Sequence, residues 1–179
     1  MGITRKAKYN INTSANESHA CISDDGLTLY FTSNREGGYG GYDIYKSEID
    51  SKGKWGPAVN LGPEINTIFD ETTPFITEDG KTLYFSSKGH FNIGGFDIFS
   101  AKKNGDSWSK PENLGFPFNT TDDDIFFFPL KNGSIAYYSK YKETGYGEND
   151  IFKIQIFERE NIPEKEKELL EQKKKDTIN

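Results

Sequence analysis

Short runs of hydrophobic and aromatic residues alternate with polar turns along most of the chain. In the middle of the sequence these runs cover residues 72–77, 81–87, 96–102 and 107–114. Asp79-Gly80 separates the first two runs and favours a tight hairpin, because glycine supplies the positive φ that the turn needs. Pro111 lies in the last run and cannot donate a hydrogen bond to a central ladder. The pattern therefore predicts a four-stranded antiparallel sheet with residues 107–114 as an edge strand.

This four-stranded unit is written three times. Asp43, Asp97 and Asp150 mark the same point of each copy, at a spacing of about 54 residues. A period of this length is typical of solenoids, propellers and arrays, and a four-stranded antiparallel repeat is typical of a propeller blade. We predict an all-β protein in which residues 1–157 form three β-propeller blades. The blades are expected at about 14–67, 68–120 and 121–157, with residues 1–13 as an outer strand.

Comparison of the repeats also predicts which side chains fill the core. Only 34% of the residues are hydrophobic, but 15% are aromatic, so a few large side chains do most of the burying. In the second repeat, the side chains expected between sheets are those of Phe75, Leu83, Phe85, Ile98 and Trp108. The one cysteine, Cys21, corresponds to Phe75 and is expected to pack as a small hydrophobic residue.

The composition changes at Glu158. Residues 158–179 are highly charged and predict a short helical tail or linker, with Asn161 as N-cap and Pro163 in the first turn. Glu171 and Lys175 form a favourable i, i+4 pair within it.

Charge and hydropathy exclude two classes of partner. The net charge of −6 is scattered along the chain, whereas a nucleic-acid backbone would require a basic patch. No stretch reaches the ~18 apolar residues of a membrane span, so no direct membrane insertion is expected.

Three acids fall at equivalent positions just before the first strand of each repeat. They are Glu17, Glu71 and Asp124. In a propeller these strands line the central channel, so the acids are candidates for a channel-mouth site that binds a cation or a basic peptide. The alternative is that each acid hydrogen-bonds the backbone of its own or the next blade. For Asp43, Asp97 and Asp150 we favour turn-stabilising hydrogen bonds at the start of the third strand.

Aromatic residues recur in the loops between the second and third strands. Tyr39, Phe91 and Tyr146 occupy these loops and are a candidate stacking surface for a sugar or a peptide. Ordinary loop packing is the alternative. The glycine-rich stretch 37–41 lacks a following helix, so it predicts a flexible loop rather than a phosphate-binding loop.

Catalytic and metal-binding patterns do not assemble. The sequence holds no Gly-x-Ser-x-Gly elbow, and its histidines, His19 and His90, lie at non-equivalent places. The acidic run 122–124 offers oxygen ligands for calcium but lacks the spacing of an EF-hand loop. We therefore expect no enzyme activity, no metal and no cofactor.

The repeat resembles a known family. The segment 71–87, followed by Gly94-Gly95-Phe96-Asp97-Ile98-Phe99, is similar to the WD-like β-propeller repeat. That repeat is found in TolB-type periplasmic proteins and in envelope proteins with an OmpA-like domain. The Gly-Gly-[Tyr/Phe]-Asp-Ile and Trp-x-x-Pro-x-Asn-Leu-Gly elements look most like versions from Bacteroidota, some of them in the type IX secretion and gliding apparatus.

The resemblance implies a location and a class of function. It implies a non-catalytic protein-interaction or scaffold module of a bacterial envelope protein, periplasmic or outer-membrane-associated, whose partner is another envelope protein. Two alternatives stay open: a propeller that binds carbohydrate or peptidoglycan fragments, and an accessory propeller of a hydrolase.

The number of blades raises a question of closure. Propellers close with about 4–8 blades, so three leave two open faces. Either the three blades are part of a longer propeller, or two copies join as a homodimer with six blades, in which residues near Ile3–Ala7 complete the third blade of the other copy.

Overall fold

The computed structural model describes residues 10–130, 135–140, 144–147 and 149–155. These residues form three antiparallel sheets and no helix. The first blade contains β1 (Glu17–Ile22), β2 (Thr28–Ser33), β3 (Asp43–Glu48) and β4 (Val59–Asn60). The second contains β5 (Glu71–Ile76), β6 (Thr82–Ser87), β7 (Asp97–Asn104), β8 (Ser107–Trp108) and β9 (Glu112–Asn113). The third contains β10 (Ile125–Pro129), β11 (Ile135–Lys140) and β12 (Asp150–Gln155). The all-β prediction and the antiparallel repeats are confirmed.

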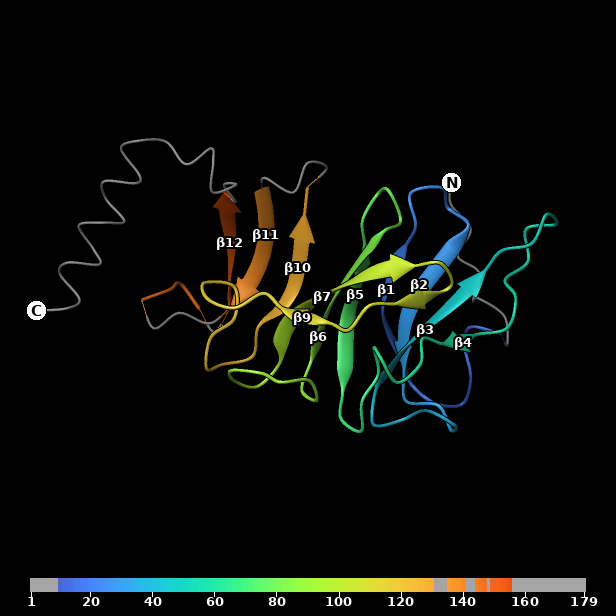
Figure 1. The fold of residues 1–179 in the computed structure, drawn as a ribbon, viewed down its shortest axis with the longest axis horizontal. Coiled ribbons are helices and arrows are strands. Elements are labelled where there is room, and N and C mark those ends of the chain that lie inside the picture. Colours follow the sequence, from blue (N-terminus) through green and yellow to red (C-terminus); the bar gives the residue numbers. More distant parts are fainter. Residues whose placement is uncertain (1–9, 131–134, 141–143, 148, 156–179) are drawn as a thin grey trace, which may run out of the picture.

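The sheets follow one another in a row, with the first and third blades at opposite ends (Figure 1). The first strand of each blade lies on the inside, because β5 contacts β1 on one side and β10 on the other. Within the described residues the sheets form an open array and do not close into a ring. The predicted helical tail at 158–179 and the first nine residues of the predicted outer strand lie outside the described residues.

The fourth strand, predicted over 107–114, lies at the edge of the sheet in two pieces. It is split into β8 and β9, which pair separately with β7. Pro111 lies between the two pieces, and its missing N–H interrupts the ladder. The first blade is divided in the same way, with an isolated bridge between Ile49 and Trp55 followed by the two-residue strand β4.

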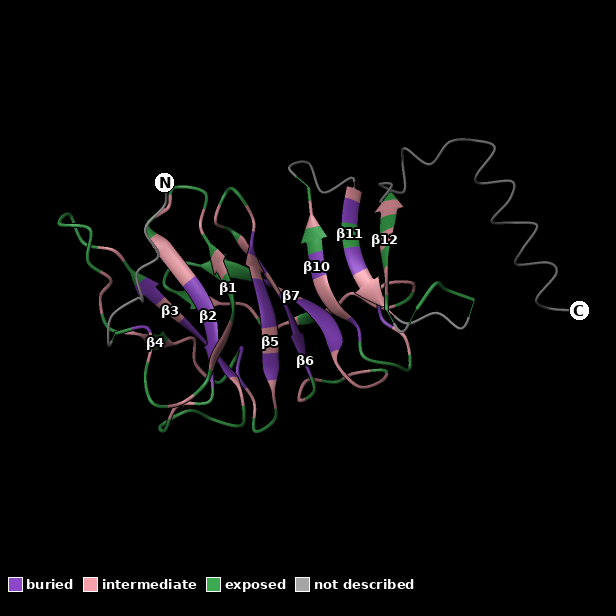
Figure 2. Cartoon of the chain, turned by 180° about the vertical axis from the view of Figure 1, so that it is seen from behind, coloured by how far each residue is buried: buried purple, intermediate pink, exposed green. Residues whose placement is uncertain are grey.

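The core lies between the sheets, and buried residues are concentrated in β2, β3, β5, β6 and β7 (Figure 2). Between the first and second blades, Tyr30 and Ile44 pack against Leu83 and Phe85. Between the second and third, Ile98 packs against Phe127 and Tyr138. Leu83, Phe85 and Ile98 are fully buried, as predicted.

The remaining predicted core residues are half-buried. Trp108 and Cys21 pack against the edge of the cluster between the first and second blades. Phe75 meets Phe128 of the third blade edge-to-face, at 5.4 Å between ring centroids.

The expected hairpin turn is present. Gly80 has a φ of 66°, and the Asp79 carboxylate accepts hydrogen bonds from the Thr77 hydroxyl and the Lys81 backbone N–H. In the part of the chain that is described, no helix has the length and apolar character needed to cross a membrane.

Candidate functional site: a cavity between the inner strands

Each innermost strand carries a bulge at the same repeat position. The register of β1, β5 and β10 against its neighbour shifts at this point. The first residue inside each shift has a positive φ although it is not glycine: 28° at His19, 48° at Thr73 and 59° at Phe126. Such φ values are uncommon, above all for a β-branched residue such as Thr73, and bulges often re-aim side chains next to functional sites. The three bulges therefore indicate that a candidate site lies on the channel side of the blades.

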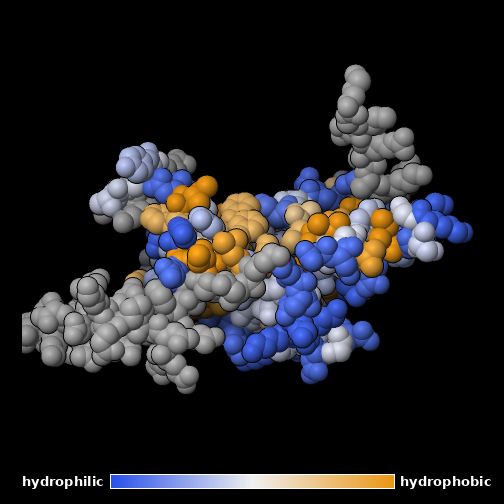
Figure 3. Space-filling view, turned by 90° about the horizontal axis from the view of Figure 1, so that it is seen from above, coloured by the Kyte–Doolittle hydropathy of each residue, from blue (hydrophilic) through white to orange (hydrophobic). Residues whose placement is uncertain are grey.

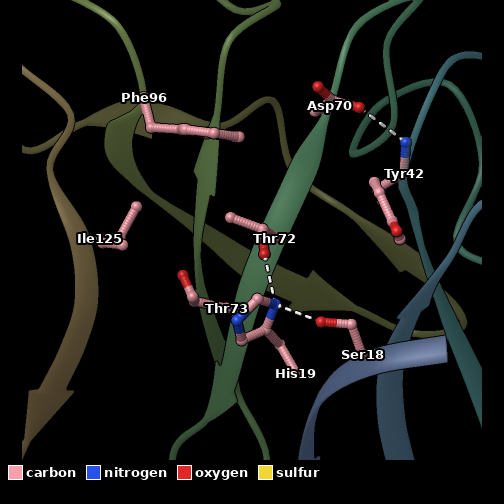
Figure 4. Close-up of a pocket in the computed structure, with 8 residues that line it drawn as sticks. All are labelled: Ser18, His19, Tyr42, Asp70, Thr72, Thr73, Phe96 and Ile125. Atoms are coloured by element: carbon pink, nitrogen blue, oxygen red, sulfur yellow. Dashed lines mark hydrogen bonds between the residues drawn. The ribbon is translucent and has the colours of Figure 1, made fainter. Parts of the chain in front are cut away.

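A cavity of about 350 Å³ opens beside these bulges (Figure 4). It is lined by Ser18, His19, Tyr42, Asp70, Thr72, Thr73, Phe96 and Ile125. Ser18, Thr72 and Ile125 are repeat equivalents from β1, β5 and β10, and Tyr42 and Phe96 are equivalents just before β3 and β7. The cavity is therefore built from all three blades. Its walls combine hydroxyl groups, aromatic rings and one carboxylate, and its volume falls in the range of small-ligand sites.

His19 links the blades at this cavity. Its Nδ1 atom lies 2.8 Å from the Ser18 Oγ and 2.8 Å from the Thr72 Oγ1 of the second blade. Its ring meets Phe126 of the third blade edge-to-face, at 5.3 Å between centroids. Burial lowers the pKa of His19, because the charged ring loses solvation there. Both of these hydrogen-bond partners of the ring are hydroxyl groups.

The three predicted channel-mouth acids hold loops to their own strands. Glu71 accepts hydrogen bonds from the backbone N–H of Thr67 at 2.8 Å, the Thr67 hydroxyl at 2.7 Å and the Ser87 hydroxyl at 2.7 Å. Glu17 makes the same bonds with Thr13 and Ser33. The carboxylate therefore ties the loop four residues upstream to the second strand of the same blade.

Asp124 occupies the equivalent repeat position, but its carboxylate is less well hydrogen-bonded. Its Oδ2 accepts hydrogen bonds from the Thr120 N–H and hydroxyl, while its buried Oδ1 has no hydrogen-bond partner among the described residues. None of Glu17, Glu71 and Asp124 lines the cavity, and Glu71 and Asp124 are fully buried. This arrangement favours the backbone-bonding role over a solvent-accessible site for a cation or a basic peptide.

The environments of the acids shift their pKa values in opposite directions. Burial raises the pKa of Glu71 and of Asp124, and hydrogen bonds offset this only in part. At Glu17, burial also acts to raise the pKa, but hydrogen bonds from Thr13 and Ser33 and the charge of Arg35 outweigh it, so the pKa is lowered. The Arg35 guanidinium lies 3.2 Å from the Glu17 carboxylate.

The aspartates at the start of the third strands stabilise turns, as predicted. Asp43 accepts a hydrogen bond from the Tyr39 N–H, Asp97 from the Ile93 N–H and Asp150 from the Tyr146 N–H. The aromatic side chains of these loops do not reach the cavity. Tyr39, Phe91 and Tyr146 are exposed, Phe91 to 94%, and their role as a stacking surface stays a prediction.

The same loops also bind to the next blade, which the sequence analysis did not predict. The backbone N–H of Tyr42 donates to the Asp70 carboxylate of the next blade at 2.9 Å, and that of Phe96 donates to Asp123 at 2.8 Å. Gly41 and Gly95 lie so close to these aspartates that a Cβ atom at either would overlap the carboxylate. The glycine pairs 40–41 and 94–95 therefore join blades, whereas the sequence pattern predicts only a flexible loop at 37–41. The sequence signal for these contacts between blades is the Gly-Gly pair that recurs in the blade before each of Asp70 and Asp123.

In the described part of the chain no three side chains of His, Cys, Asp or Glu lie together as metal ligands would.

Comparison with known proteins identifies the class of fold. No family model and no curated protein matches the sequence. Among solved structures, one assigned as TolB from Agrobacterium tumefaciens is similar over 81% of this chain and 47% of its own, with 19% identity and a TM-score of 0.55. TolB from Acinetobacter baumannii is similar over 76% of this chain and 29% of its own, with 17% identity and a TM-score of 0.51. The described blades therefore have a TolB-like propeller fold, and the chain spans less than half the length of these structures.

Proposed function

We propose that the chain is a non-catalytic protein-interaction module of a bacterial envelope protein, which acts in the periplasm or at the outer membrane. The TolB-like fold supports the periplasmic location at a coarse level. The repeat's resemblance to OmpA-family and type IX secretion proteins supports the outer-membrane association. The partner in this proposal is another envelope protein.

The cavity between the inner strands is the observation that carries the proposal. The hydroxyl groups of Ser18 and Thr72 can exchange hydrogen bonds with peptide amides, and the rings of Tyr42 and Phe96 offer apolar walls. The Asp70 carboxylate provides a partner for a basic side chain. An extended peptide segment of a partner protein therefore fits the chemistry of this site.

Selection from a library of displayed peptides on the purified chain tests this function, followed by calorimetry on the enriched peptides. Thr72→Trp fills the cavity and should weaken binding by at least about tenfold, which corresponds to ~1.4 kcal/mol. Glu112→Trp places the same ring on the exposed strand β9 and should leave binding unchanged. Peptides that bind the parent and Thr72→Trp equally well would contradict the cavity as the site.

A carbohydrate-binding role is the second candidate, supported by the exposed rings of Tyr39, Phe91 and Tyr146. A glycan array that includes peptidoglycan fragments separates the two functions. Binding that is lost in Phe91→Ala but kept in Thr72→Trp would favour the carbohydrate function. An array without signal, together with peptide binding at the cavity, would favour protein interaction.

A further inference from the structure

The third blade exposes a face that the first two blades bury. Ile44, Ile98 and Ile151 occupy the same position in the third strand of each blade. Ile44 and Ile98 are 0% exposed because the next blade covers them, whereas Ile151 is 80% exposed. Tyr137 is likewise exposed, although its counterpart Tyr30 is buried against the second blade. We call the set Phe128, Tyr137 and Ile151 the leading face of the third blade.

The first blade exposes the opposite face of the repeat. Ile22 is 50% exposed, while its counterpart Ile76 is 4% exposed and packs against the first blade. Ala20 is exposed, while its counterparts Pro74 and Phe127 are buried. Leu29 is half-buried, while Leu83 is fully buried. We call the set Ala20, Ile22 and Leu29 the trailing face of the first blade.

The structure shows twice what covers a leading face. At both internal joints, the leading face of one blade packs on the trailing face of the next. The pair Tyr84 and Phe127 illustrates the second joint, with 5.0 Å between ring centroids. The free trailing face of the same chain lies at the far end of the array (Figure 1). A second copy of the chain, however, carries an unoccupied trailing face of its own.

We propose that the leading face of the third blade docks on the trailing face of the first blade of a second copy. The same contact made in both directions joins two three-bladed arrays through a two-fold axis, and the six blades fall within the range in which propellers close. Closure covers apolar surface that is otherwise exposed to water. Hydrophobic residues also gather on the side of the array that is seen from above (Figure 3).

Ring closure also changes the candidate site. The cavity is lined by the inner strands of one array only, with β1 and β10 as its outermost walls. In the six-bladed ring, β10 of one copy lies beside β1 of the other, as β5 lies beside β10 within one chain. Each copy then contributes side chains to a shared channel, so the site is incomplete without the second copy.

Light scattering on the purified full chain over a range of concentrations tests the assembly. The expected result is a discrete species of twice the 20.3 kDa chain mass at high concentration. Ile151→Arg, on the leading face, should abolish this species. Phe91→Arg, at an exposed loop position outside both faces, should preserve it.

Cross-linking tests the geometry of the contact. By repeat equivalence to Tyr84 and Phe127, Tyr137 of one copy should lie beside Ala20 of the other. In a Cys21→Ser background, the double variant Ala20→Cys/Tyr137→Cys should form a disulfide-linked dimer on oxidation, and neither single cysteine variant should do so. A monomer at all concentrations, or a ladder of growing oligomers in place of one closed species, would overturn the proposal.

Discussion

Gly94 of the second blade lies against the backbone carbonyl of Thr120, in the loop that leads into the third blade. A Cβ atom on Gly94 would lie 2.5 Å from the Thr120 oxygen. This neighbour is backbone and cannot rotate away as a side chain can. The approach of the two loops therefore depends on glycine, and the joint between blades is built from main-chain contacts as well as from the apolar core.

Gly94→Ala should destabilise the chain. The methyl group overpacks the joint, and such overpacking costs roughly 1–3 kcal/mol. Gly147 is the equivalent position in the third blade and serves as the matched control, because a Cβ atom there meets nothing within 4 Å. Urea unfolding in dilute solution, where contacts between copies contribute least, should show a lower midpoint for Gly94→Ala and no change for Gly147→Ala. Equal midpoints for the two variants would contradict this account of the joint.

The aromatic core predicts a second contrast. Phe85 is 1% exposed and stacks on Phe99 at 6.0 Å between centroids. Phe85→Ala should lower the free energy of unfolding by about 3–5 kcal/mol, because a large cavity replaces the ring. Phe91→Ala removes the same ring from an exposed loop and should stay within about 0.5 kcal/mol of the parent. Calorimetric melting measures both, and a Phe85→Ala melt indistinguishable from that of the parent would refute the core assignment.

The repeat made the blades predictable from the sequence, because the hairpin at Asp79-Gly80 and the hydrophobic runs between polar turns are local signals. The break of the fourth strand was signalled by Pro111, but the sequence pattern alone did not show that two short pieces would pair on either side of it. The bulges at His19, Thr73 and Phe126 carry no glycine, so no local feature announced their positive φ values.

The cavity was harder to predict, because no local feature of the sequence marks it either. The cavity forms where side chains of β1, β5 and β10 converge, and this convergence depends on how the blades pack. Repeat alignment correctly found the equivalent acids Glu17, Glu71 and Asp124. It could not show that two of them are fully buried, or that Asp70, one residue before Glu71, is the acid that faces the cavity.

His19 should make the stability of the chain fall in mild acid. Burial lowers its pKa in the folded state below the ordinary 6.5, so the unfolded chain binds the proton more readily. The free energy of unfolding of the parent should therefore fall as the pH drops below about 6.5, and His19→Gln should remove this part of the pH dependence. Titration of the His19 ring by NMR checks the cause directly, and a midpoint at or above the ordinary value would contradict it.

The contributions of Glu17 and Asp124 to the stability of the fold should depend on pH in opposite ways, although the two acids occupy the same repeat position. The pKa of Glu17 is lowered, so its charged form stabilises the fold above the ordinary pKa near 4.5, and this stabilisation is lost as the pH falls through the lowered folded value. Glu17→Gln should therefore destabilise the chain at neutral pH and have a smaller effect in acid.

The pKa of Asp124 is raised by burial, so its charged form destabilises the fold at neutral pH, and this penalty fades as the pH falls through the raised value toward 3.8. Asp124→Asn should stabilise the chain at neutral pH, and the gain should shrink in acid. Urea unfolding of both variants across this pH range tests the pair, and a loss of stability in Asp124→Asn that is constant with pH would show that the hydrogen bonds of Thr120, rather than the buried charge, dominate at this position.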